Sequence, residues 1–148
     1  MKTIKHQIEI NLNQTDLFDL TQDYSRCLDW DSYLSEAYLL NGAKFANVGV
    51  DSFCKNKSGL VMISRYISFN RPSVAAVTMI KGSFILSRFS GAWNVKKIDE
   101  MNSILIFTYN FELKGGLLGR LILPIVAYFF SNDMKKRLSA IKNYVERK

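Results

Sequence analysis

Three side chains of this sequence have the chemistry to act on a small molecule. His6 interrupts the apolar face of an alternating segment near the start of the chain. Because the imidazole pKa lies near neutral pH, this side chain could act as a general base. Arg65 lies among apolar residues and could pair with a ligand carboxylate, and Tyr109 could take part in proton transfer. They would form a catalytic site only if the fold brought them into one cavity.

These residues also have structural interpretations. His6 could be a hydrogen-bonded structural residue, and Arg65 could lie exposed at the edge of a strand. The sequence contains no recognisable Ser–His–Asp arrangement, paired-carboxylate motif or phosphate-binding loop. Cys27 and Cys54 have no ligand spacing and, with one His in the chain, cannot assemble a zinc site. We therefore expect two reduced thiols, no metal and no cofactor.

The elements that must position these residues follow from periodicity and turn signals. Residues 3–13 alternate apolar and polar side chains, which predicts a strand. Two short helices are expected next, the first through Leu17, Phe18 and Leu20 and the second around residues 24–28. Six further runs are strand-like and end at turn-prone residues. They span residues 35–40, 48–54, 60–69, 74–81, 84–98 and 103–113.

The last of these runs has one aromatic face. Phe107, Tyr109 and Phe111 alternate with polar residues such as Thr108 and Asn110. This pattern is typical of an antiparallel strand with one side buried and the other in solvent.

After Gly116 the pattern changes to that of a helix. Apolar residues recur every three or four positions and share one face. They are Phe130, Met134, Leu138, Ile141 and Val145. The first turns, residues 117–129, are apolar nearly all round, so we expect them to be buried on more than one side. Pro124 predicts a kink or a restart of the helix. The apolar run is too short to span a membrane, because Arg120 and Asp133 bound it.

Both ends of the chain resemble one superfamily. The stretch IEINLNQTDLFDLTQDYSRCLDWDSYL, with Asp23 and Trp30, is similar to the opening of START-like proteins of the polyketide cyclase/dehydrase (SRPBCC) group. The stretch GGLLGRLILPIVAYFF and the later Leu138, Ile141, Lys142 and Glu146 resemble the Gly-rich start and the end of that group's last helix. The resemblance implies an α+β helix-grip fold in one domain, residues 1–148. In this fold a curved antiparallel sheet of about six or seven strands wraps around the long C-terminal helix.

The resemblance further implies an elongated apolar cavity between the sheet and the last helix. Plain core packing remains the alternative for each single residue of its expected wall. The residues expected to bind a ligand there are Met62, Tyr66, Phe89, Trp93, Phe107, Tyr109, Phe111, Leu123, Ala127 and Phe130.

Three functions remain open at this point. The first is binding or carriage of a small lipophilic ligand such as a lipid, a polyketide or another aromatic molecule. The second is an enzyme of the polyketide cyclase/dehydrase kind. The third is a membrane- or protein-interaction module akin to coenzyme-Q-binding proteins of this superfamily, which a filled interior and a large exposed apolar patch would favour.

The charge and the N-terminal sequence bear on partners and location. The formal net charge is +7, with a basic excess in residues 133–148. This end could contact an acidic membrane surface transiently, or it could be the solvated face of a helix. No nucleic-acid-binding motif accompanies it, so we expect no nucleic-acid partner. The first residues lack the apolar core of a secretory signal, so a cytoplasmic location is expected.

Overall fold

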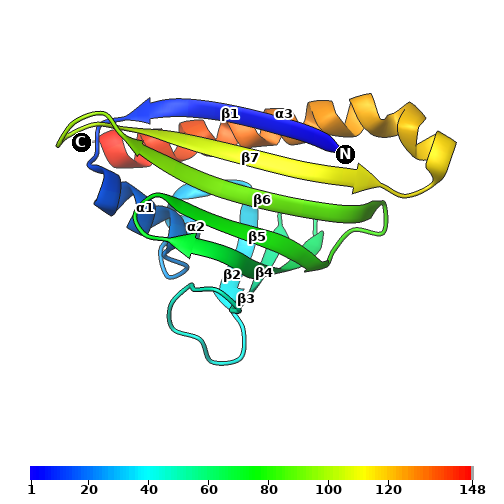
Figure 1. The fold of residues 1–148 in the computed structure, drawn as a ribbon, viewed down its shortest axis with the longest axis horizontal. Coiled ribbons are helices and arrows are strands. Elements are labelled where there is room, and N and C mark those ends of the chain that lie inside the picture. The colour runs from blue at the N-terminus through cyan, green and yellow to red at the C-terminus, as the bar shows by residue number, and fades with distance from the viewer. Residues whose placement is uncertain (148) are drawn as a thin grey trace.

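The protein, here a computed structural model that describes residues 1–147, is built on one seven-stranded antiparallel sheet (Figure 1). The strand order is β1-β7-β6-β5-β4-β3-β2. This is the α+β helix-grip architecture that the sequence predicts, and each predicted run overlaps one observed element. The strands are β1 (Lys2–Ile10), β2 (Leu34–Leu39), β3 (Asp51–Asn56), β4 (Val61–Asn70), β5 (Val74–Lys81), β6 (Leu86–Lys97) and β7 (Ser103–Leu113).

Three helices complete the chain: α1 (Gln14–Gln22), α2 (Cys27–Trp30) and α3 (Gly116–Glu146). The first and last strands of the sequence are neighbours, and His6 lies opposite Phe107 in their register. The long α3 packs mainly on β1 and β7 and lies behind them in Figure 1. The two short helices lie near the C-terminal end of α3, at one end of the sheet.

The core lies where the sheet, α1 and α3 meet. Its fully buried side chains come from all three, and each contributes about 1.5–3 kcal/mol through burial. The predicted apolar stripe of α3 is confirmed, because Met134, Leu138 and Ile141 are buried. Other fully buried residues are Ile10, Leu17, Phe18, Leu105 and Phe111.

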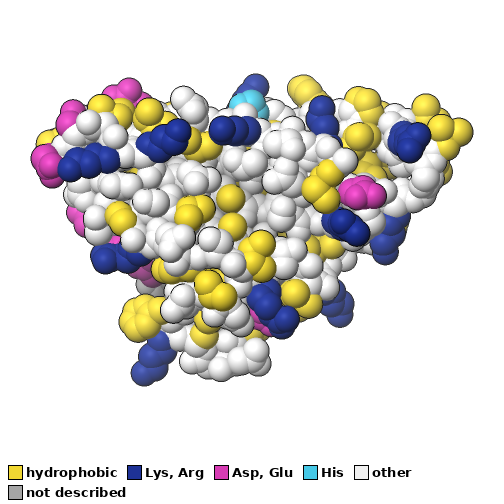
Figure 2. All heavy atoms as spheres, viewed as in Figure 1, with side chains coloured by type: hydrophobic (Ala, Val, Ile, Leu, Met, Phe, Trp, Pro, Cys, Tyr) yellow, Lys and Arg dark blue, Asp and Glu magenta, His cyan; other side chains and the backbone are white. Residues whose placement is uncertain are grey.

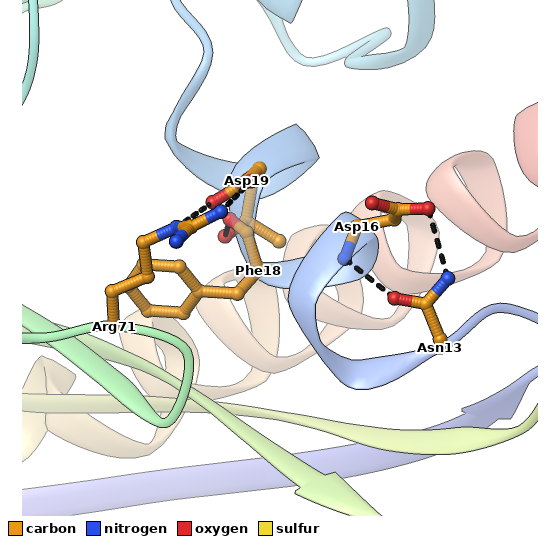
Figure 3. Close-up of polar contacts among 6 residues, drawn as sticks. Asn13, Asp16, Phe18, Asp19 and Arg71 are labelled. Atoms are coloured by element: carbon orange, nitrogen blue, oxygen red, sulfur yellow. Dashed lines mark hydrogen bonds and ion pairs between the residues drawn. The ribbon is translucent and has the colours of Figure 1, made fainter. Parts of the chain in front are cut away.

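Local contacts fix α1 against the sheet (Figure 3). Asn13 caps the helix, and its Oδ1 accepts the Asp16 N–H at 2.9 Å; such a cap stabilises by about 0.5–2 kcal/mol. Phe18 is buried from α1, and its ring meets Phe69 edge-on at 5.4 Å. Arg71, in the turn between β4 and β5, donates two hydrogen bonds of 2.7 Å to Asp19.

The prediction that the first turns of α3 are buried on more than one side is wrong. Leu117, Leu121 and Tyr128 are 74%, 68% and 67% exposed. Because α3 crosses the edge of the sheet formed by β1 and β7, only one of its faces meets other elements. The helix also runs unbroken through Pro124, so the predicted restart does not occur. Pro124 has no backbone N–H, so one carbonyl oxygen of the preceding turn lacks its helical hydrogen bond. Pro124 lies on the exposed face, where water can donate to that oxygen instead.

Candidate functional site

A cavity of about 190 Å³ lies between the sheet and α3. Its wall is mostly aromatic and aliphatic, with a few hydroxyls and one guanidinium. This volume is below the ~300–1,000 Å³ of sites for drug-sized ligands, so it suits a compact molecule or the compact end of a longer one. Residues that line it include Tyr24, Tyr33, Ser52, Cys54, Met62, Ser64, Tyr66, Val77, Phe89, Gly91, Trp93, Phe107, Tyr109, Phe130, Asp133 and Arg137.

Arg137 of α3 is the strongest polar group of the cavity. Its Nε and Nη2 donate to Asp31 Oδ2 at 3.0 and 2.8 Å, and its Nη1 donates to the Tyr109 hydroxyl at 2.7 Å. The Asp31 carboxylate is fully buried and also accepts the Tyr33 N–H. A guanidinium carries two hydrogens on each terminal nitrogen. Among residues 1–147, one hydrogen on Nη1 and one on Nη2 therefore have no hydrogen-bond acceptor.

Aromatic rings surround this guanidinium, and its polar partners keep it charged. Its central carbon lies 5.4 Å from the ring centre of Tyr33, 5.8 Å from that of Trp93 and 4.9 Å from that of Phe107, within the range of cation–π attraction. Burial alone would lower the pKa of Arg137, but the nearby Asp31 and Tyr109 outweigh it and the pKa lies well above its usual value. The cavity therefore holds a permanent, partly satisfied cation.

Tyr109 adds a second donor beside Arg137. Burial raises the pKa of Tyr109 to about 12, so its phenol stays protonated at neutral pH. Within the described chain its recorded hydrogen bond is the one accepted from Arg137, which leaves its own O–H proton to donate. Arg137 and Tyr109 together can hold one oxygen atom of a ligand.

A second polar group, Tyr66, lies on another part of the wall and is fully engaged. Its hydroxyl donates to Gln22 Oε1 at 2.7 Å and lies 2.8 Å from the hydroxyl of Tyr24. Burial raises the pKa of Tyr24 to about 12 and that of Tyr66 well above its usual value. These phenols are thus structural donors and acceptors rather than bases at neutral pH.

Asp133 is the carboxylate of the cavity wall. Burial raises its pKa, although Lys136 and Arg137 nearby act in the opposite direction. A carboxyl group with a raised pKa beside a cation is suited to proton transfer. Within residues 1–147, no group of three or more His, Cys, Asp or Glu side chains is arranged to hold a metal ion.

The structure places most of the residues expected to bind a ligand around this cavity. Those that line it are Met62, Tyr66, Phe89, Trp93, Phe107, Tyr109 and Phe130. Phe111 is fully buried behind Phe130, with ring centres 4.9 Å apart. Ala127 is part of the hydrophobic core, and Leu123 packs against that core. Neither residue lines the cavity. Ligand binding by any of them stays a prediction.

The three candidate catalytic residues do not meet. Tyr109 lines the cavity, whereas the His6 Nε2 lies 2.6 Å from the Ser131 hydroxyl of α3, outside the cavity. Burial and Lys135 lower the pKa of His6. Arg65 is exposed and donates to both oxygens of Asp51. It points away from the cavity because its neighbours Ser64 and Tyr66 point into it.

Sequence reasoning missed Arg137, Asp31 and Asp133. The sequence does contain a signal for Arg137. It follows Met134 by three residues and precedes Ile141 by four, which is the spacing of residues on the buried face of the helix. A charged residue in that stripe predicts a buried partner. No comparable signal marks Asp31, because its burial depends on how α2 meets α3.

The two half-buried cysteines, Cys27 and Cys54, give a first prediction. Burial raises the pKa of Cys27 to about 12 and that of Cys54 to about 11. Since the thiolate is the reactive form, we expect iodoacetamide at neutral pH to label both at least about a hundredfold more slowly than in the unfolded chain. Mass spectrometry of the time course measures this. Equal rates in folded and unfolded protein would contradict the burial of these thiols.

Comparison with known proteins adds the family. The model of the family described as polyketide cyclase / dehydrase and lipid transport matches residues 1–146. The chain belongs to this family. Membership supports a ligand-binding or cyclase-like role. A comparison with curated proteins gave no match.

Solved structures show the same fold at low identity. A START superfamily protein from Mycobacterium smegmatis is 11% identical with a TM-score of 0.81, over 98% of this chain and 97% of that one. The Zhui aromatase/cyclase from Streptomyces sp. R1128 is 16% identical with a TM-score of 0.80, over 99% and 94%. The protein XoxI from Bacillus cereus is 15% identical with a TM-score of 0.80, over 99% and 97%.

Proposed function

We propose that this chain binds a small lipophilic molecule that carries a carbonyl or carboxylate oxygen, with that oxygen at Arg137 and Tyr109. The observation that carries the proposal is a charged, partly satisfied guanidinium in an otherwise aromatic cavity. A flat ligand would lie against Phe89, Trp93 and Phe107. A ligand without an oxygen would leave the two donors unpaired, which weakens binding.

A matched pair of probes tests this proposal. 2-Acetylnaphthalene and 2-ethylnaphthalene have nearly the same shape, but only the ketone can accept a hydrogen bond. We expect calorimetry to show the ketone binding about ten- to a hundredfold more tightly, since hydrogen bonds to charged groups contribute ~1.5–3 kcal/mol. Tyr109→Phe should shrink this preference, and Arg65→Gln, on the outer surface, should leave it unchanged. Equal affinities of the two probes for the wild-type protein would overturn the proposal.

The cavity wall also favours a second function, an enzyme of the cyclase kind. Asp133 could remove a proton next to a ligand carbonyl, while Arg137 and Tyr109 stabilise the enolate oxygen that forms. The enolate carbon could then attack a second carbonyl of the same molecule and close a ring, and the alkoxide formed from that carbonyl would take the proton back from Asp133. The carboxyl of Asp133 lies on the wall that Arg137 shares, which is the observation that supports this role.

Hydrogen–deuterium exchange separates carriage from catalysis. If the site forms enolates, the methyl protons of 2-acetylnaphthalene will exchange with D2O faster with the protein than without it, as followed by NMR. Asp133→Asn should abolish the acceleration and leave the binding of the ketone unchanged. Binding without accelerated exchange would assign the protein to carriage alone.

A further inference from the structure

The exposed face of α3 changes its chemistry half-way along the helix. Its first part, here called the apolar face, consists of exposed apolar side chains. About five full turns after Leu117 and Leu118, the same face presents Lys135 and Lys136. The apolar face comprises Leu117, Leu118, Leu121, Ile125, Tyr128 and Phe129, which are 58–74% exposed.

A neighbouring loop adds an exposed aromatic side chain near the start of α3. Phe84 is 83% exposed, and the next residue, Ile85, accepts the Lys114 N–H at 2.8 Å just before α3 begins. Figure 2 shows hydrophobic side chains beside Lys and Arg at the end of the molecule where α3 starts. Contiguous exposed apolar surface of this kind marks an interaction site.

The charges around the apolar face are positive. Lys114 and Arg120 are exposed beside it, Lys135 and Lys136 continue it, and the sequence from Leu113 to Asn132 contains no Asp or Glu. A second copy of the chain docked face to face would bring these like charges together. An anionic lipid surface is complementary to both parts, since apolar and aromatic side chains enter the headgroup boundary while cations meet acidic headgroups.

We propose that this face of α3, with Phe84, docks the protein on an anionic membrane, with the helix lying in the plane of the interface. The sequence predicted an apolar run too short to span a membrane, whereas the whole of α3 is long and apolar enough to cross one by length and composition. Its other face, however, is fixed in the fold by buried Met134, Leu138 and Ile141 and by the Arg137–Asp31 pair. The sequence pointed to the basic end of α3 as the contact, and the structure adds the apolar face before it.

The docked face lies close to the cavity. Phe129 belongs to the apolar face, and Phe130 lines the cavity on the next position of the same helix. A lipophilic ligand could therefore pass between the bilayer and the cavity without crossing bulk water. Docking rests on the outer surface of α3 and on Phe84, and ligand binding rests on the cavity, so the two proposals can fail separately.

Vesicle sedimentation tests the proposal. We expect the untagged protein to sediment with vesicles that contain phosphatidylserine, much less with phosphatidylcholine alone, and to be released by high salt. Lys135→Gln with Lys136→Gln should weaken binding about fivefold for each lysine removed. Leu121→Gln with Phe129→Gln should weaken it about tenfold or more.

Matched variants away from α3 control for the loss of exposed apolar side chains and of positive charge. Phe45→Gln with Val48→Gln, and Lys44→Gln with Lys57→Gln, change exposed residues of the same kinds away from α3 and should bind like the wild type. Thermal melting checks that every variant is folded. Three results with vesicles overturn the proposal: no binding to acidic vesicles, equal loss in the control variants, or resistance to carbonate extraction, which would indicate a spanning helix. A salt-resistant dimer that Leu121→Gln with Phe129→Gln dissociates would assign the face to a second copy instead.

Discussion

Arg137→Ala is expected to lower the free energy of unfolding by about 3–5 kcal/mol, because it leaves the buried carboxylate of Asp31 without its cation. The Asp31 side chain is fully buried and that of Arg137 is 13% exposed, so water cannot replace the lost partner. Chemical denaturation followed by tryptophan fluorescence measures the change.

The double variant Asp31→Leu with Arg137→Met separates charge from packing. Replacing both partners by apolar residues leaves no buried charge, so much of the lost stability should return. Arg71→Ala is the matched control, because its bidentate pair with Asp19 is exposed on both sides and should contribute little. A wild-type-like unfolding curve for Arg137→Ala would contradict the buried pair.

Gly119→Ala is expected to destabilise the protein by about 1–3 kcal/mol, although alanine is the better helix former. A Cβ atom at this position would lie 2.4 Å from the backbone carbonyl oxygen of Lys114 and 3.2 Å from its carbon. Backbone atoms cannot move aside as a flexible side chain can, so the start of α3 must shift away from the end of β7.

Ser139→Ala, on the exposed part of the same helix, is the control for helix propensity. It should leave stability unchanged or raise it by a few tenths of a kcal/mol, roughly the propensity difference. A melting temperature that Gly119→Ala raises as Ser139→Ala does would contradict the close contact between Gly119 and the Lys114 carbonyl.

The order of strands and helices was predictable because each element carries its own period. The alternation in β7 and the three-to-four spacing of Met134, Leu138 and Ile141 each mark a buried face without reference to other elements. Exposure of the first turns of α3 was not predictable in this way. A helix that is apolar on all sides is buried only where other elements pack on each of its faces. In this fold no element packs on the outer face of α3.

The site was predictable in its aromatic wall and not in its polar centre. Residues such as Trp93 and Phe107 lie on the inward faces of β6 and β7, so alternation places them correctly. Tyr109 and Arg137 come from β7 and α3, and Asp31 is the C-cap residue directly after α2. Only the packing of these elements brings the three side chains within hydrogen-bonding distance. His6 shows the converse case, since its alternation is clear but its side chain contacts Ser131 of α3 and does not line the cavity.

The most direct test of ligand binding is the mass of the freshly purified, untagged protein under native and denaturing conditions. We expect the native wild-type protein to carry a small lipophilic molecule that denaturation releases. Gly91→Leu is the matched variant, because a Cβ at Gly91 would contact the Tyr109 ring at 3.6 Å and extend the side chain into the cavity. This variant should fold and carry no such molecule. Identical native and denatured masses for the wild type, or the same bound molecule in Gly91→Leu, would contradict binding in this cavity.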